Sequence, residues 1–140
     1  VYKRQVLEIG TGSGYQAAVL GEVVHRGRVH TIEIVSDLAR SARKRLAGLG
    51  YQNVVVHTGD GYLGLPEYAP FDGVMVTAAA REIPAPLLEQ LKPGGRLVMP
   101  VGGQNETQWL TVISKDSAGE IDRRVVLPVR FVPLTGDPTK

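Results

Sequence analysis

The chain has 140 residues, of which 43% are hydrophobic, and this length and composition predict one domain with a substantial core. It carries 16 basic and 14 acidic residues, so its net charge is only +2. The chain has no cysteine, which excludes a disulfide framework and a thiolate nucleophile. We find no signal peptide and no apolar run as long as a membrane span. We therefore expect a cytoplasmic protein without a membrane partner.

The chain does not begin with methionine, and its first residues lead almost at once into an apolar run. We interpret residues 1–5 as a non-native or truncated start and expect that an upstream segment is missing. Residues 6–140 show no internal repeat and no linker, so we predict that they form a single domain.

The first expected strand, residues 6–9, leads into a loop in which glycines alternate with other residues. These glycines are Gly10, Gly12 and Gly14. Glycine lets the backbone turn sharply and lets a ligand lie against bare main chain, which a Cβ atom would obstruct. We therefore predict that these glycines form a cofactor-binding loop. The alternative is a glycine-rich turn that serves only the packing of a strand against a helix.

The spacing of the glycines favours S-adenosylmethionine as the cofactor. A dinucleotide-binding loop reads G-x-G-x-x-G, and its third glycine would fall on Tyr15. Here Glu8 precedes the first glycine, and the pattern E-x-G-x-G-x-G is typical of S-adenosylmethionine-dependent methyltransferases. We include Glu8 among the cofactor-binding residues and keep a nicotinamide cofactor as the alternative.

Strand-like and helix-like segments alternate along most of the chain. Strands are expected at residues 6–9, 28–34, 54–57, 73–77 and 96–100, and helices at 16–24, 36–49 and 87–91. Two further strand-like runs, residues 109–114 and 125–132, are joined by a polar turn and predict a terminal hairpin. This order predicts an α/β fold, a doubly wound, mostly parallel, Rossmann-like methyltransferase sheet with a C-terminal antiparallel hairpin.

The helix expected after residue 35 is amphipathic. Ser36 or Asp37 is expected to cap its start, and Gly50 to end it. The residues expected to be buried on its apolar face are Leu38, Ala42, Leu46 and Leu49. Its basic residues then point to solvent, and we interpret them as a solvated face rather than a nucleic-acid-binding surface.

Ligands of a doubly wound sheet bind outside the carboxyl ends of its strands. Glu33 ends the second expected strand, where its carboxylate can accept hydrogen bonds from both ribose hydroxyls. Asp60 and Gly61 follow the third strand, where the carboxylate can accept from an adenine amino group and the glycine lets main chain approach the ring. We interpret Asp72 as a residue that anchors a loop.

No metal site is predicted. The three histidines, His25, His30 and His57, have no metal-ligand spacing, and we expect them at the surface or at strand ends. Ser13 lies between glycines, but its surroundings do not match the G-x-S-x-G turn of a hydrolase.

The chain resembles the protein-L-isoaspartate O-methyltransferase family over nearly all of residues 6–136. The residues that carry this similarity are 6–16, 59–61, 70–72, 76–80, 90–98 and 129–135. The resemblance implies methyl transfer from S-adenosyl-L-methionine to the carboxylate of L-isoaspartyl residues in damaged proteins. It also implies that Thr135 helps to close over the cofactor and that Val132 lines the substrate site. Isoaspartyl peptides and proteins are the implied partners, and we expect a monomer that binds no nucleic acid.

The chain departs from the family at its start. Members of the family carry an upstream segment with a serine or threonine near the substrate carboxylate, and this chain begins after it. We therefore assign no catalytic residue. Two alternatives stay open: another class I methyltransferase that acts on a small molecule or nucleic acid, and a fragment that binds cofactor without turnover.

Overall fold

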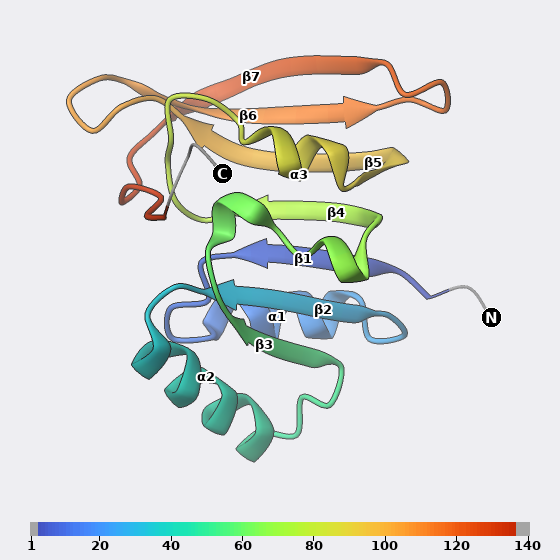
Figure 1. Cartoon of the computed structure of the whole chain (residues 1–140), viewed down its shortest axis with the longest axis vertical. Helices are drawn as coiled ribbons and strands as arrows, with labels where there is room; N and C mark the ends of the chain where they lie inside the picture. Colours follow the sequence, from blue (N-terminus) through green and yellow to red (C-terminus); the bar gives the residue numbers. More distant parts are fainter. Residues whose placement is uncertain (1–2, 137–140) are drawn as a thin grey trace.

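The structure is a computed structural model that describes residues 3–136. Its strands form one sheet in the order β3-β2-β1-β4-β5-β6-β7 (Figure 1). The strands are β1 (Gln5–Ile9), β2 (Arg28–Glu33), β3 (Val54–Thr58), β4 (Phe71–Val76), β5 (Leu91–Val101), β6 (Gln108–Lys115) and β7 (Ile121–Val129). Strands β1 to β5 pair in parallel, and β6 and β7 pair antiparallel. The predicted fold class and the terminal hairpin are thus confirmed.

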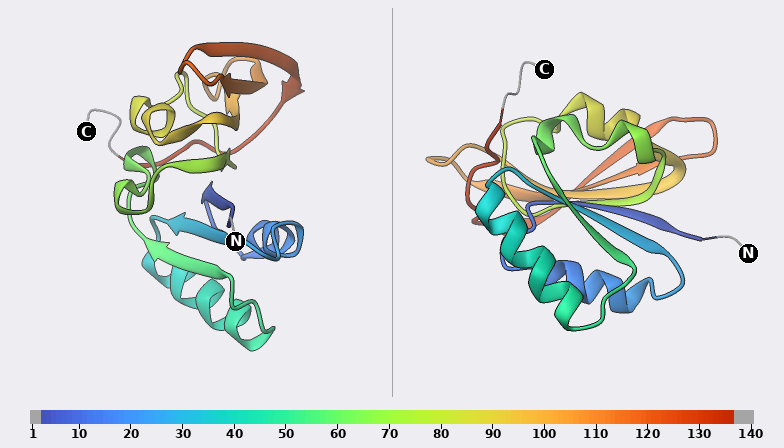
Figure 2. Two further views of the ribbon diagram at one scale, coloured as in Figure 1. Left: turned by 90° about the vertical axis from the view of Figure 1, so that its right-hand side faces the viewer. Right: turned by 60° about the horizontal axis from the view of Figure 1, so that its bottom comes forward.

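Helices cover opposite faces of the two halves of this sheet. The helices α1 (Tyr15–Val23) and α2 (Ser36–Gly48) lie on one face, while α3 (Ala85–Glu89) lies on the other with the 3₁₀ turns η1 (Gly61–Leu63) and η2 (Pro66–Tyr68) (Figure 2). Among residues 3–136, every helix is too short or too polar to span a bilayer.

Two groups of buried side chains hold these layers together. The larger group lies on the α3 side of the sheet, and its largest members are Leu7, Ile9, Phe71, Leu87, Leu91, Leu97 and Met99. The smaller group joins α1 and α2 to the sheet through Ala17, Ala39, Leu46 and Val56. Strands are buried on both faces where both faces of a parallel sheet are covered, and β1 shows this because its successive residues Leu7, Glu8 and Ile9 are all buried.

The buried face of α2 differs from the expected one. Ala42 and Leu46 are buried as predicted, but Leu38 and Leu49 are 46% and 66% exposed, and Ala39 is buried instead. The helix is rotated so that the small Ala39 faces the sheet, and Leu49 lies just beyond the last helical turn. The predicted cap is also wrong, because Val35 occupies the capping position and no side chain caps this helix.

The observed bounds of α3 and the start of β5 also differ from the predicted ones. Helix α3 begins and ends earlier than predicted, and β5 begins at Leu91 instead of residue 96. Leu91 pairs with Phe71, whereas Arg96 pairs with Gly73, so the residues between them form an irregularity in β5. Gly94, with φ of +88°, supplies the left-handed conformation that this irregularity requires.

Strand β7 also begins earlier than predicted and ends earlier, at Val129. The turn before it is tight because the side chain of Asp116 accepts hydrogen bonds from the backbone nitrogens of Ala118 and Glu120. Residues 130–136 leave the sheet and cross to the carboxyl ends of the central strands (Figure 1). The chain end therefore reaches the edge where a ligand is expected.

One histidine is not where it was expected. His30 is 1% exposed, in the middle of β2, because Tyr68 of η2 stacks on its ring with 4.2 Å between centroids. Its Nδ1 atom lies 3.0 Å from Nε2 of His57, and its Nε2 atom lies 2.9 Å from Oε1 of Gln5. Burial, followed by the charges of His57 and Arg28, lowers the pKa of His30 to about 4. The ring is therefore neutral at pH 7.

Candidate cofactor site

A cavity of about 350 Å³ lies at the carboxyl ends of β1, β2 and β4. Six of the residues predicted to bind cofactor or substrate line it, namely Gly10, Gly12, Glu33, Gly61, Val132 and Thr135. They come from four separate stretches of the chain, which the parallel strands and the C-terminal segment bring together. The cavity lies where a doubly wound sheet binds its ligands.

The glycine loop has the backbone conformation that its sequence predicts. Gly10, Gly12 and Gly14 have φ values of +97°, +54° and +91°, in the left-handed region that side chains disfavour. A Cβ atom on Gly10 would lie 2.6 Å from Oγ1 of Thr77. Gly14 does not line the cavity; it lies at the start of α1 and packs against Leu46.

Glu33 connects three parts of the site. Its Oε1 atom accepts a hydrogen bond from the Gly12 nitrogen at 2.8 Å, and its Oε2 atom accepts one from the Val35 nitrogen at 3.1 Å. The end of β2 is thereby joined to the glycine loop and to the start of α2. The residue is 8% exposed and lines the cavity, so its carboxylate can accept further hydrogen bonds from a ligand.

Glu8 lies behind the loop and does not line the cavity. It is fully buried, and its Oε1 atom accepts a hydrogen bond of 2.6 Å from the Thr31 hydroxyl. The Thr31 and Thr11 hydroxyl oxygens are also 2.6 Å apart, so Glu8 reaches the loop through two threonines. Burial raises the pKa of Glu8 to about 7, against the opposing effect of the Thr31 hydrogen bond. We expect Glu8 to support the loop, and direct contact with the cofactor has no geometric support.

Asp60 and Gly61 have different surroundings. Asp60 does not line the cavity; its Oδ1 atom accepts a hydrogen bond of 2.9 Å from the Tyr62 nitrogen and so caps η1. Gly61 forms part of the cavity wall, and a Cβ atom there would lie 2.3 Å from Cγ2 of Ile9. The glycine is therefore required for the close packing of η1 against β1.

The C-terminal segment closes one side of the cavity by pairing with Ala79, which follows β4. The Ala79 nitrogen donates to the Val132 carbonyl, and the Leu134 nitrogen donates to the Ala79 carbonyl, both at 2.8 Å. This pairing places Thr135 in the cavity wall, while Val132 lies at the rim and is 68% exposed.

Thr77 was not among the predicted site residues. Its hydroxyl lies 2.9 Å from the carbonyl oxygens of both Ile9 and Gly10, so its one hydrogen is shared between these two acceptors, and the residue lines the cavity. Its position directly after β4 is the signal that could have found it, since ligands lie beyond the carboxyl ends of strands. Asp72 has the anchoring role that was predicted, because it accepts a hydrogen bond from the Gln5 nitrogen at 2.8 Å.

A second cavity, of about 650 Å³, adjoins the first. The two share Pro133 and Leu134, and the second is bounded on its other sides by Tyr62, residues 79–85 and residues 102–104. A group bound in the first cavity therefore has a neighbouring space for a second molecule. Residues 3–136 contain no cluster of side chains that could hold a metal ion.

The doubly wound sheet and its glycine loop define the class I methyltransferase fold. The sequence profile of the protein-L-isoaspartate(D-aspartate) O-methyltransferase family matches residues 2–139, and the chain belongs to this family.

Individual relatives agree with this assignment. The protein-L-isoaspartate O-methyltransferase 2 of Syntrophobacter fumaroxidans is 60% identical over 131 residues, which are 94% of this chain and 52% of that protein. A solved protein-L-isoaspartate O-methyltransferase has a TM-score of 0.88 at 35% identity, covering 95% of this chain and 42% of the other. A Plasmodium falciparum structure of a beta-aspartate methyltransferase with S-adenosyl-L-homocysteine has a TM-score of 0.81 at 25% identity, covering 94% and 66%. This chain spans about half the length of the curated relatives it matches.

Proposed function

We propose that this chain binds S-adenosyl-L-methionine in the cavity of about 350 Å³ at the carboxyl edge of the sheet. The observation that carries the proposal is that Gly10, Gly12, Glu33 and Gly61, predicted separately from the sequence, line this one cavity. Glu33 would accept the ribose hydroxyls, and Gly61 with the neighbouring Asp60 would lie at the adenine. Thr135 would close over the cofactor.

We propose further that the whole protein methylates the carboxylate of L-isoaspartyl residues in damaged proteins, as the names of its relatives state for them. The adjoining cavity of about 650 Å³ would receive the peptide, with Pro133 and Leu134 between the two cavities and Val132 beside them at the rim of the first. We propose a monomer that acts in the cytoplasm and binds no nucleic acid.

Methyl transfer to a carboxylate requires no proton transfer by the protein. When bound, S-adenosyl-L-methionine supplies a methyl group on a positively charged sulfur. The acceptor carboxylate is already ionised at pH 7, so neither a general base nor a metal is required. Transfer would form an oxygen–carbon bond on the acceptor as the carbon–sulfur bond breaks, which would leave a neutral thioether.

The contribution of the chain is then to bind, orient and exclude water. Alignment of reacting groups accounts for roughly 7 to 11 kcal/mol in intramolecular reactions. The loop held by Glu33 and Thr77 would fix the cofactor, and the C-terminal segment paired with Ala79 would separate the site from solvent.

Methyl transfer is tested with labelled S-adenosyl-L-methionine and a set of acceptors. With the chain extended to the relatives' length, we expect an isoaspartyl peptide to be methylated, and the matching aspartyl peptide, tRNA and small catechols to remain unlabelled. Labelling of tRNA or a catechol in preference to the isoaspartyl peptide would instead support another class I methyltransferase.

The length of the relatives motivates a second comparison, between this chain and one extended to the relatives' length. We expect the 140-residue chain to bind S-adenosyl-L-homocysteine weakly and to form methyl ester slowly or not at all. Extension should increase turnover more than affinity, because alignment and water exclusion act mainly on the transition state. Equal turnover by the two chains would show that residues 1–140 hold the whole active site, and binding without ester would assign this chain as a cofactor-binding fragment.

A further inference from the structure

Leu38 is an apolar residue whose position the hydrophobic core does not explain. Its side chain is 46% exposed on α2, whereas the next residue, Ala39, is fully buried. Residues four apart in a helix share a face, so Leu38 lies on the same side as Ala42, at the border of the buried stripe. A single exposed leucine is common at a protein surface, so the location of Leu38 decides what it can do.

Two contacts fix the start of α2 and with it the place of Leu38. The Val35 nitrogen donates to Oε2 of Glu33 at 3.1 Å, which joins the start of the helix to the end of β2. Gly14, at the start of α1, lies against Leu46 and Ala42 on the buried face of α2. Figure 1 shows α2 beginning beside the carboxyl end of β2. Leu38, in the first turn of α2, is therefore held at the edge where a doubly wound sheet binds its ligands.

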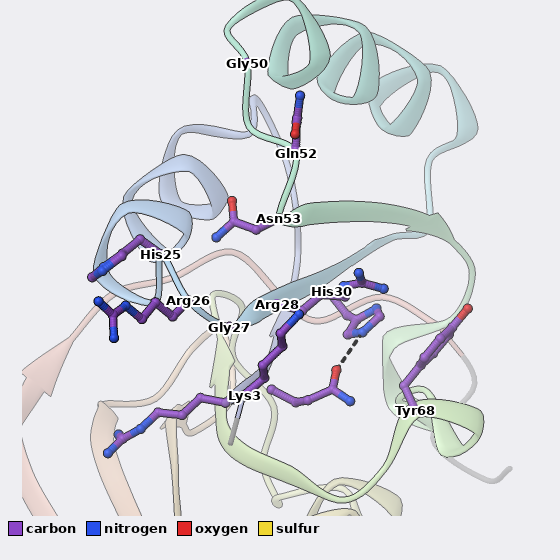
Figure 3. A pocket seen from close by; sticks show the side chains of 12 residues that line it. Lys3, His25, Arg26, Gly27, Arg28, His30, Gly50, Gln52, Asn53 and Tyr68 are labelled. Atoms are coloured by element: carbon purple, nitrogen blue, oxygen red, sulfur yellow. Dashed lines mark hydrogen bonds between the residues drawn. The ribbon is translucent and has the colours of Figure 1, made fainter. Parts of the chain in front are cut away.

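Leu38 forms part of the wall of the proposed cofactor cavity, together with Ile34, which is 41% exposed. Val35 lies between them in the sequence and is 48% exposed, but it does not line this cavity, so exposure alone does not bring a residue into the wall. A cavity of about 910 Å³ at the amino ends of β1, β2 and β3 has no valine, leucine or isoleucine among its described lining residues (Figure 3). Exposed aliphatic side chains are thus a property of the cofactor cavity and not of sheet edges in general.

The neighbouring residues indicate which part of a ligand would contact Leu38. Among the described residues that line the cofactor cavity, Glu33 is the one with a charged side chain, and it directly precedes Ile34. Its carboxylate accepts hydrogen bonds from hydroxyl groups, whereas Leu38 and Ile34 favour an apolar group that displaces water. A nucleoside combines these two features, because its ribose carries hydroxyls and its flat purine ring is joined directly to the ribose.

We propose that Leu38 is a cofactor-binding residue that packs against the purine ring of S-adenosyl-L-methionine, with Ile34 beside it and Glu33 at the adjoining ribose. This inference rests on the proposed cofactor site and adds to it the residue that holds the ring by apolar contact. The small Ala39 lets α2 approach the sheet, while the larger Leu38 serves the ligand. Burial of its exposed surface would therefore contribute to affinity and little to the stability of the free protein.

The test is calorimetric titration with S-adenosyl-L-homocysteine, in the 140-residue chain and in a chain extended to the relatives' length. We expect Leu38→Ala to bind about fivefold more weakly, since apolar contact area is lost. Leu38→Met keeps an apolar side chain of similar volume and should stay within about twofold of the parent. Leu49→Ala is the matched control, because Leu49 is 66% exposed at the other end of α2 and does not line the cavity. Melting temperatures without ligand check that every variant folds.

Two further measurements identify the part of the ligand that Leu38 contacts. 5′-Methylthioadenosine carries the purine and the ribose without the amino-acid end, so Leu38→Ala should weaken its binding by the same factor. Nuclear magnetic resonance should show Overhauser contacts between the Leu38 methyl groups and the H2 or H8 proton of the bound adenine. A role of Leu38 in folding alone would produce neither result.

Equal affinity of the parent and Leu38→Ala would overturn this inference and leave the cofactor site in place. Failure of S-adenosyl-L-homocysteine to bind either parent chain would overturn the proposed function and this inference with it. If Leu38→Ala weakened binding of S-adenosyl-L-homocysteine but not of 5′-methylthioadenosine, Leu38 would lie at the amino-acid end of the ligand and its assignment to the purine would be wrong. Normal binding with a lowered melting temperature in the extended Leu38→Ala chain would show that the added residues cover Leu38, which also overturns the inference.

Discussion

The carboxylate of Glu33 is hydrogen-bonded to the backbone nitrogen of Gly12, with 2.8 Å between Oε1 and N. Its other oxygen accepts from the Val35 nitrogen, so one side chain sets the position of both the glycine loop and the start of α2. The residue proposed to bind ribose therefore also shapes the cavity around it. Its substitution should affect both binding and stability.

We expect Glu33→Ala to weaken binding of S-adenosyl-L-homocysteine roughly tenfold or more, because hydrogen bonds to a charged group contribute about 1.5 to 3 kcal/mol. The variant should fold but lose about 1 to 3 kcal/mol of stability, since two partly buried backbone nitrogens lose a charged acceptor. Asp37→Ala is the matched control, because Asp37 is an exposed acid on α2 that pairs only with Arg40 in the described structure. Unchanged affinity in a folded Glu33→Ala protein would remove Glu33 from the site.

Cofactor preference follows from the spacing of the glycines. S-adenosyl-L-homocysteine should raise the melting temperature of the chain, since a ligand that binds the folded state stabilises it, and NAD should not. Thermal unfolding with each ligand at the same concentration makes the comparison. Stabilisation by NAD alone would contradict the assignment of the cavity to S-adenosyl-L-methionine.

The buried carboxyl of Glu8 should make stability fall as pH rises. Burial raises its pKa from 4.5 to about 7, so between these values the folded state holds a proton that the unfolded state has lost. The free energy of unfolding therefore decreases across this interval, by an amount on the order of 3 kcal/mol, and levels off above pH 7. Glu8→Gln should remove this dependence and be more stable than the parent at about pH 8, because the amide oxygen still accepts from Thr31.

Urea unfolding of the parent and Glu8→Gln across this pH range is the measurement. His30 contributes in the opposite direction, because its lowered pKa makes stability rise with pH between about 4 and 6.5. That contribution is common to both proteins, so the difference between the two curves reports Glu8. Parallel curves would show that the Glu8 pKa is not raised.

Gly61 and Gly48 offer a matched pair of glycine substitutions. Gly61→Ala places a Cβ atom 2.3 Å from Ile9, and we expect it to lose about 1 to 3 kcal/mol of stability and to weaken cofactor binding. Gly48→Ala meets no atom within 4 Å at the end of α2, and it should gain about 0.5 to 1 kcal/mol. Denaturant unfolding and calorimetric titration of both variants test this. Equal effects of the two substitutions would exclude close packing as the reason for glycine at position 61.

Several features could be predicted from the sequence because they depend only on residues close together along the chain. The left-handed conformations of Gly10 and Gly12 follow from the steric freedom of glycine, and the alternation of strands and helices follows from the period of apolar residues. Glu33 and Gly61, predicted as cofactor-binding residues, line one cavity because strand ends of a doubly wound sheet meet at one edge.

Other features were decided only by contacts between distant parts of the chain. The rotation of α2 that buries Ala39 in place of Leu38 depends on the helix meeting the sheet, which an amphipathic pattern with two adjacent apolar residues does not determine. Burial of His30 depends on Tyr68, 38 positions further along the chain.

The sequence by itself therefore determined the class of fold, the cofactor loop and most residues of the proposed cofactor site, because each rests on backbone conformation or on the periodicity of one segment. The tertiary structure alone decided that Glu8 lies behind the loop and that Glu33 holds Gly12. Hydrogen-bond partners and desolvation arise between residues far apart in sequence, so they exist only once the sheet has assembled.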